Sequence, residues 1–250
     1  MAAEVLVLAG TSEATALAER LDERGVAVVS SLAGVTSSAV ARPGAVRVGG
    51  FGGVEGLTAY LRAEAIGAVV DATHPFAAVM PFHVADAAAA TGVPHVRLLR
   101  PAWVPRDGDR WVDVGSMAEA AAALDGCRAE RVFLATGRQQ LDPFRACTRQ
   151  WFLVRSIEPV TDPLPRSSEI RDRGPFTVDG ECRLLTEQRI DTVVAKNAGG
   201  SATEAKLAAA RALGLTVVMV RRPPQPDGVP VVETVEEAVA WVLRQARRGV

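Results

Sequence analysis

The chain has 250 residues, of which 48% are hydrophobic and 23% charged, and its formal net charge is −1 at pH 7. This near-neutral balance gives no basis for a nucleic-acid partner or an anionic membrane surface. No apolar stretch approaches the length of a membrane span, and Glu4 stands where a signal peptide would carry basic residues, so we expect a cytoplasmic protein.

The first predicted strand, residues 5–8, is a continuous apolar run of the kind that is buried on both faces of a parallel sheet. Gly10 allows a tight turn, and Thr11 and Ser12 are suited to cap the helix that follows. Glu13 suits the first turn of that helix, whose free N–H groups can bind a phosphate. We therefore predict a cofactor-binding turn over these four residues. A βα turn without a ligand is the alternative, because a single glycine is not a G-x-G-x-x-G fingerprint.

The second predicted strand, residues 26–31, ends where a dinucleotide-binding fold holds the adenosine ribose. An acidic residue at that point would repel the 2′-phosphate of NADP(H), but the strand end carries Ser30, Ser31 and Gly34 instead. Serine hydroxyls can donate hydrogen bonds to a phosphate. These residues predict NADPH as the cofactor in preference to NADH, with a polar strand end that binds nothing as the alternative.

A short strand at residues 45–48 and a helix at residues 54–64 come next. The apolar strand that follows, residues 68–71, leads directly to Thr73 and His74. Because parallel sheets bind ligands beyond the carboxyl ends of their strands, we predict that these two side chains contact cofactor or substrate. A histidine with a purely structural role is the alternative.

Pro81 has two interpretations: it lies in the first turn of the next helix, or it kinks an earlier one. A fifth strand at residues 94–98 completes a doubly wound, nucleotide-binding domain, which we place at residues 1–99. A proline-bracketed linker then leads to a second α/β domain, which we place at residues 100–250.

The second half repeats the alternation of strands and helices, and two of its strand ends carry polar groups. Thr136, Gly137 and Arg138 follow one strand, and Lys196 and Asn197 follow another. An ammonium, an amide and a glycine turn suit an anionic ligand, with an ordinary surface turn as the alternative. The expected strands are residues 131–135, 151–156, 190–195 and 215–220, and the expected helices are residues 117–124, 203–213 and 235–247.

Taken together, these stretches resemble the precorrin-6A reductase family of cobalamin biosynthesis. The two most specific matches are the D-A-T-H-P-F-A and K-N-A-G-G segments. Ala9 stands where the family often has another glycine. The matching segments span nearly the whole chain in the expected order: Gly10-Thr11-Ser12-Glu13, Gly49-Gly50-Phe51-Gly52, Asp71-Ala72-Thr73-His74-Pro75-Phe76-Ala77, Arg100-Pro101-Ala102-Trp103, Thr136-Gly137-Arg138 and Lys196-Asn197-Ala198-Gly199-Gly200.

The resemblance implies two Rossmann-like domains with mainly parallel sheets and an active-site cleft between them. It implies an NADPH-dependent oxidoreductase that reduces the precorrin-6A macrocycle to precorrin-6B by saturating its C18–C19 double bond. The substrate partner is then a tetrapyrrole with several carboxylates, and neighbouring enzymes of the cobalamin pathway are further candidate partners. We expect His74 and Lys196 at the reacting centre, and Arg138 beside phosphate or substrate carboxylates. A cobalt-precorrin-6A reductase of the anaerobic pathway and a non-catalytic dinucleotide-sensing module are the alternatives.

Several other enzyme classes are excluded by motifs that the sequence lacks. The single tyrosine, Tyr60, has Glu64 four residues later, so the Tyr-x-x-x-Lys pair of short-chain dehydrogenases is missing. There is no P-loop, no H-E-x-x-H and no G-x-S-x-G. The three histidines do not have the spacing of a zinc site, and the three cysteines are too far apart for a Cys-x-x-Cys pair, so we expect no metal.

Overall fold

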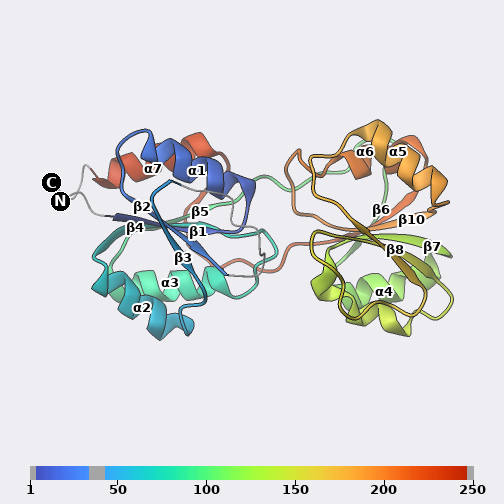
Figure 1. Cartoon of the computed structure of the whole chain (residues 1–250), viewed down its shortest axis with the longest axis horizontal. Helices are drawn as coiled ribbons and strands as arrows, with labels where there is room; N and C mark the ends of the chain where they lie inside the picture. The colour runs from blue at the N-terminus through green and yellow to red at the C-terminus, as the bar shows by residue number, and fades with distance from the viewer. Residues whose placement is uncertain (1–3, 34–42, 247–250) are drawn as a thin grey trace. The chain divides into compact units, whose positions relative to one another are not determined.

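The computed structural model describes residues 4–33 and 43–246. These residues form two α/β units (Figure 1): the first contains residues 4–33, 43–101 and 223–246, and the second contains residues 102–222. Each unit has a six-stranded parallel sheet with helices on both faces. The predicted fold class, two Rossmann-like domains with parallel sheets, is confirmed.

The central strands of the first sheet are short apolar runs that helices cover on both sides, whereas the edge strand Ala45–Val48 is largely exposed. The strands are β1 (Glu4–Ala9), β2 (Val28–Leu32), β3 (Ala45–Val48), β4 (Ile66–Ala72), β5 (His95–Leu98) and β12 (Val231–Val232). Their order across the sheet is β3–β2–β1–β4–β5–β12. The chain order reverses between β1 and β4, which is where open α/β sheets bind ligands beyond the carboxyl ends of their strands. The loops after β1 and β4 therefore define the candidate site.

Two helices cover each face of this sheet (Figure 1). On one face, α1 and α7 share a core with the sheet, in which Leu17, Leu21 and Val242 are at most 1% exposed. Such a stripe of apolar residues at helical spacing is what a sheet-covering helix needs. The helices are α1 (Ser12–Asp22) and α7 (Val235–Ala246) on that face, and α2 (Gly53–Ala63) and α3 (Met80–Thr91) on the other.

Helix α3 resolves the two interpretations of Pro81. It begins at Met80, so Pro81 lies in the first turn, where a missing N–H costs no helical hydrogen bond. The helix ends at Thr91, and Gly92 caps it in a left-handed conformation that glycine adopts without strain.

The second sheet has the same reversal of chain order, here between β7 and β10. Its order is β9–β8–β7–β10–β11–β6. Helix α4 covers one face and helices α5 and α6 cover the other (Figure 1). The elements are β6 (Arg110–Val114), α4 (Met117–Gly126), β7 (Arg131–Ala135), β8 (Trp151–Ser156), β9 (Ser167–Arg171), α5 (Val178–Glu187), β10 (Thr192–Lys196), α6 (Ala205–Ala212) and β11 (Thr216–Val220), with short 3-10 helices η1 (Arg138–Gln140) and η2 (Asp142–Ala146) after β7.

The unit boundaries differ from the expected division into residues 1–99 and 100–250. The chain returns to the first unit after residue 222, where β12 pairs in parallel with β5 and α7 packs beside α1. The proline-rich connection before β12 returns the chain to the first unit. The expected division missed this return because neither periodicity nor composition indicates which sheet an edge strand joins. The first unit therefore has six strands, one more than the sequence predicted.

The elements that sequence reasoning missed are edge strands and one polar helix. β6 and β9 lie at opposite edges of the second sheet, and most of their residues are exposed or half-buried, so they lack the apolar run of a buried strand. Helix α5 is mostly polar, with Leu185 as its fully buried apolar anchor.

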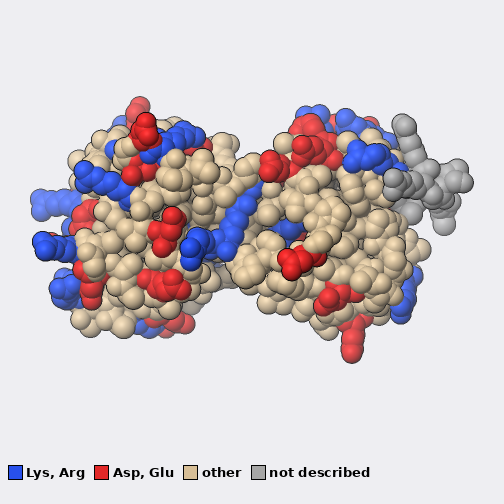
Figure 2. Space-filling model, turned by 180° about the vertical axis from the view of Figure 1, so that it is seen from behind, with Lys and Arg blue, Asp and Glu red and all other residues tan. Residues whose placement is uncertain are grey.

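One face of the protein shows no single dominant charge. Over the face drawn in Figure 2, basic and acidic side chains are interspersed, in keeping with the formal net charge of −1. Among the helices that the structure describes, none is both long enough and apolar enough to cross a membrane.

Candidate active site

The loops after β1 and β4 meet at the carboxyl edge of the first sheet. A Cβ atom at Gly10 would lie 3.3 Å from the backbone nitrogen of His74 and 3.6 Å from the Cα atom of Thr73, so this close approach favours glycine. Thr11 Oγ1 donates a hydrogen bond to the carbonyl oxygen of Ala72 at 3.0 Å. The same hydroxyl caps α1 by accepting from the Ala14 N–H at 3.1 Å. The structure thus brings two of the predicted site segments together.

Asp71 anchors the loop that carries Thr73 and His74. One carboxylate oxygen of Asp71 accepts from the Thr73 N–H at 3.0 Å and from the Thr73 hydroxyl at 2.6 Å. The other oxygen accepts from Arg97 Nη1 at 2.9 Å, and this ion pair is buried. Burial lowers the pKa of Arg97, an effect that the charge of Asp71 opposes. The role of Arg97 was missed, although an arginine within an otherwise apolar strand is a usable signal.

The hydrogen bonding of His74 defines which ring nitrogen can donate. Its Nδ1 accepts a hydrogen bond from the Phe76 N–H at 3.2 Å. In the neutral ring this leaves the proton on Nε2. The half-buried His74 side chain can therefore offer a donor at the edge where the sequence predicts a ligand.

Ser12 and Glu13 begin helix α1 beside the cation of Arg100, which the sequence did not connect with this turn. Ser12 Oγ donates to Glu13 Oε2 at 3.1 Å, and Arg100 Nη1 lies 2.7 Å from the same oxygen. Burial raises the pKa of Glu13, but the hydrogen bond from its own backbone N–H and the neighbouring Arg100 outweigh burial and lower it. Glu13 therefore stays ionised, and Arg100 balances its charge at the helix start.

Ser30 and Ser31 lie within the sheet, because β2 continues to Leu32, and they are 0% and 5% exposed. Their contact with a cofactor phosphate stays a prediction, which this burial does not favour. Ser30 Oγ has no hydrogen-bond partner among the described residues, and Ser31 Oγ accepts from Arg47 Nη1 at 3.4 Å. Gly34 lies outside the described residues.

Arg47 is the cation that the structure places beside this strand end. Its guanidinium stacks 3.8 Å from the ring centroid of Phe51 and donates to the carbonyl oxygens of Gly49 and Gly50 at 2.5 and 2.6 Å. These contacts fix a positive charge at the end of β3, next to β2. An arginine at this position can accommodate the 2′-phosphate of NADP(H).

In the second unit, Thr136 and Lys196 lie at the ends of the neighbouring strands β7 and β10. Ala135 pairs with Ala195, so the two following residues reach the same sheet edge. Thr136 is 7% exposed, and its hydroxyl has no hydrogen-bond partner among the described residues. Burial lowers the pKa of Lys196, which marks an ammonium that is partly withdrawn from water.

Gly137 and Arg138 continue from this edge into η1. Gly137 has a φ of 78°, a conformation that side chains rarely adopt. Arg138 Nη1 donates to the carbonyl oxygen of Pro159 at 3.5 Å, and the side chain borders a hollow of about 290 Å³. Arg145, which also borders it, is paired with Asp142, whereas Arg138 makes no ion pair with a described acid.

The side-chain amide of Asn197 bonds to the backbone of Trp103, and its contact with a cofactor stays a prediction. Its side-chain Oδ1 accepts from the Trp103 N–H at 2.8 Å, and its Nδ2 donates to the Trp103 carbonyl at 2.9 Å. Arg222 donates to the backbone carbonyls of Asn197 and Ala198 at 2.9 and 3.1 Å. The amide of Asn197 is thus engaged by Trp103, so the K-N-A-G-G loop holds the two ends of the second unit. The sequence contains no local signal for contacts across so many residues.

The candidate residues therefore form two groups, one on the carboxyl edge of each sheet, and none of them is placed as a metal ligand. Among the described residues there is no group of three or more His, Cys, Asp or Glu side chains that could hold a metal ion.

Comparisons with known proteins agree over nearly the full chain. The family model "Precorrin-6x reductase CbiJ/CobK" matches residues 4–243. A precorrin-6A reductase of Rhodococcus erythropolis is 48% identical over 98% of this chain and 99% of its own length. A precorrin-6A reductase of Mycobacterium tuberculosis is 47% identical over 95% of this chain and 96% of its own length. A cobalt-precorrin-6A reductase of Salmonella typhimurium is 27% identical over 98% of this chain and 96% of its own length.

A solved structure has the same architecture. "CobK precorrin-6A reductase" superposes with a TM-score of 0.91, at 44% sequence identity and with 97% of each chain covered.

Proposed function

The chain belongs to the precorrin-6x reductase family, and from that premise we propose that it reduces precorrin-6A to precorrin-6B with NADPH as the hydride source. The observation that carries the proposal is the meeting of the β1 and β4 loops at the point where the strand order reverses. Cobalt-free precorrin-6A is favoured over its cobalt complex, because identity to the named precorrin-6A reductases is 46–48% and to the cobalt-precorrin-6A reductases 27–31%.

The residues of the first unit fit a dinucleotide. Gly10 lets the β1 loop lie against the backbone of His74, beside the start of α1, where free N–H groups favour a phosphate. Arg47 supplies a positive charge at the end of β3, and no acid occupies the described end of β2 to repel a 2′-phosphate. These features support NADPH rather than NADH, and they move the expected contact from Ser30 and Ser31 to Arg47.

A bound nicotinamide supplies the hydride; the chain supplies binding and orientation. His74, held through Nδ1, presents Nε2–H as a donor to the macrocycle or to the cofactor amide. The Asp71–Thr73 hydrogen bonds keep this loop in one conformation, which is what orientation of two reactants requires. We assign His74 a place at the reacting centre as a hydrogen-bond donor, with the proton that completes the reduction taken from water, because loss of the Nε2 proton from the neutral ring would leave an imidazolate anion.

Lys196 and Arg138 are the proposed partners of anionic groups in the second unit. A partly desolvated ammonium binds carboxylate or phosphate more strongly than an exposed one. Thr136, whose buried hydroxyl has no hydrogen-bond partner among the described residues, adds a neutral hydrogen-bonding group beside Lys196. The negative carboxylates of the macrocycle are complementary to the positive charges of Lys196 and Arg138.

The proposal is tested by anaerobic assay of NADPH oxidation with precorrin-6A and with cobalt-precorrin-6A side by side. We expect oxidation that depends on precorrin-6A, a product heavier by two hydrogen atoms, and slower turnover with NADH. Faster turnover of the cobalt complex would reassign the substrate. Binding of NADPH without oxidation in the presence of either macrocycle would favour the sensing module instead.

A further inference from the structure

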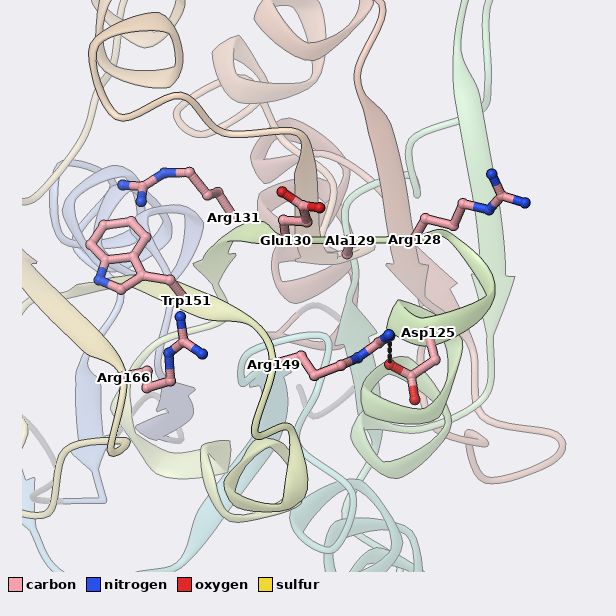
Figure 3. A pocket seen from close by; sticks show the side chains of 8 residues that line it. All are labelled: Asp125, Arg128, Ala129, Glu130, Arg131, Arg149, Trp151 and Arg166. Atoms are coloured by element: carbon pink, nitrogen blue, oxygen red, sulfur yellow. Dashed lines mark hydrogen bonds and ion pairs between the residues drawn. The ribbon is translucent and has the colours of Figure 1, made fainter.

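A hollow lies at the amino edge of the second sheet, the opposite edge from Thr136 and Lys196. Its volume is about 750 Å³, within the range of small-molecule pockets. The lining comes from the end of α4, the turn that follows it, the start of β7 and the residues at or just before the starts of β8 and β9. Its charged and aromatic members are Asp125, Arg128, Glu130, Arg131, Arg149, Trp151 and Arg166 (Figure 3). One strand length, roughly 16 Å for five residues, separates it from the candidate active site.

Positive charge exceeds negative charge in this lining, with four arginines facing two acids. Arg149 is paired with Asp125 at 2.7 Å, and Gln150 also donates to that carboxylate at 3.0 Å. Arg128, Arg131 and Arg166 make no ion pair with any acid that the structure describes. An anion in the hollow would relieve the repulsion between them.

Two of these arginines are held in place by uncharged partners. Arg131 stacks 3.9 Å from the ring centroid of Trp151, and its Nε donates to the carbonyl oxygen of Gln188 at 2.7 Å. Arg166 Nη1 donates to the carbonyl oxygen of Thr148 at 3.2 Å. In Figure 3 the guanidinium groups of Arg131 and Arg166 flank Trp151. Contacts with π-electrons and carbonyls fix the two groups without neutralising them, so their remaining N–H groups can form paired bonds to anionic oxygens.

We propose that this hollow is a second ligand site, separate from the active site, for a small polyanion with two or more phosphate or carboxylate groups. Arg131 and Arg166 bind the anionic groups from the two sides of Trp151. Arg149, which is paired with Asp125, forms the edge of the site. Phosphorylated metabolites and polycarboxylates share this chemistry, and the experiment below separates them.

The test is isothermal titration of the full-length chain at low salt with two probes, inorganic tripolyphosphate and tricarballylate, each with and without saturating NADPH. We expect one probe to bind with one-to-one stoichiometry whether or not NADPH is present. Affinity should fall as salt is raised, as for an exposed ion pair. The probe that binds more tightly identifies the phosphate or the carboxylate class.

Variants assign the binding to the hollow. Arg166→Ala should weaken binding by about ten-fold, as the loss of a charge-assisted hydrogen bond does, and Arg166→Glu should weaken it further. Arg183→Ala removes an exposed arginine of α5 that does not line the hollow and should leave affinity unchanged. Because the side chain of Arg166 is exposed, we expect these variants to fold. Thermal melting of each variant without ligand checks this.

Three outcomes would overturn the proposal. The first is that neither probe binds. The second is that NADPH displaces the bound probe, which would place the probe in the cofactor site. The third is that Arg166→Ala and Arg166→Glu bind the probe as tightly as the wild type.

Discussion

Asp71 and Arg97 form a buried ion pair directly behind the loop that carries Thr73 and His74. Arg97 Nη1 lies 2.9 Å from Asp71 Oδ2, and the two side chains are 2% and 3% exposed. The second oxygen of Asp71 receives both hydrogen bonds from Thr73. The pair therefore joins the core of the first unit to the edge where the proposed chemistry takes place.

Breaking this pair should reduce both stability and activity. Arg97→Met leaves a buried, unpaired carboxylate, which costs about 3–5 kcal/mol in comparable cases, and Asp71→Asn leaves a buried, unpaired guanidinium. The double variant should recover part of the lost stability, because no buried charge remains. Denaturant unfolding of the four proteins measures the coupling; strictly additive losses would show that the pair is not coupled.

The matched control is the other buried ion pair, Arg155 and Glu181 of the second unit, which are bonded at 2.7 and 3.0 Å. Arg155→Met should cost similar stability and leave the KM for NADPH unchanged, whereas Arg97→Met should raise it.

Arg47 should determine the preference for NADPH. Arg47→Ala removes the cation beside the end of β2 and should raise the KM for NADPH about ten-fold, with little effect on NADH, which lacks the 2′-phosphate. Steady-state kinetics with both cofactors measure the ratio. Equal losses with NADPH and NADH would mean that Arg47 supports the loop but does not contact the phosphate.

Lys196 should bind an anionic group of cofactor or substrate. Lys196→Ala removes a charge-assisted hydrogen bond worth roughly 1.5–3 kcal/mol, so the KM for one of the two ligands should rise about ten- to a hundred-fold. Lys196→Arg should recover part of the lost affinity, because the planar guanidinium keeps the positive charge but does not fit a site shaped for an ammonium equally well. The control is Lys206→Met: Lys206 is the other lysine of the chain, is buried on α6, and should affect stability but neither KM. Unchanged constants in Lys196→Ala would remove Lys196 from the site.

Ligand binding through Lys196 should also depend on pH. Because burial lowers the pKa of Lys196 below its ordinary value of 10.5, the ammonium loses its proton at a lower pH than in an exposed lysine. Binding is then complete below the lowered pKa and weakens as the pH rises through it. The affected KM of the wild type should rise in this alkaline range, and that of Lys196→Arg should not, since arginine stays protonated. Parallel pH profiles for both proteins would contradict the assignment.

The strands that carry the candidate site could be predicted from sequence because they are buried on both faces. β1, β4, β7 and β10 are apolar runs, and the residues after them necessarily reach the carboxyl edge of a parallel sheet. The positions of Gly10, Thr73, His74 and Lys196 follow from this rule alone. Their roles as ligand contacts stay predictions, as does a cleft between the two units.

What the sequence could not reveal depends on residues far apart in the chain. Ser30 and Ser31 were expected at a strand end because the pattern does not show that β2 continues to Leu32. Arg47 and Arg97 act through partners on neighbouring strands, and no local spacing indicates those contacts. β12 is two residues long and joins a sheet more than a hundred residues away in sequence, so no period or composition marks it.

If precorrin-6A is reduced at the carboxyl edge of the first sheet, replacement of His74 by alanine should slow the reaction. The measurement is precorrin-6A-dependent NADPH oxidation, with unfolding of the wild type and the variant as the control for stability. Loss of the Nε2–H donor should lower kcat about ten-fold or more while stability is largely kept, because the ring is only half-buried. A folded His74→Ala variant that turns over at the wild-type rate would contradict the account.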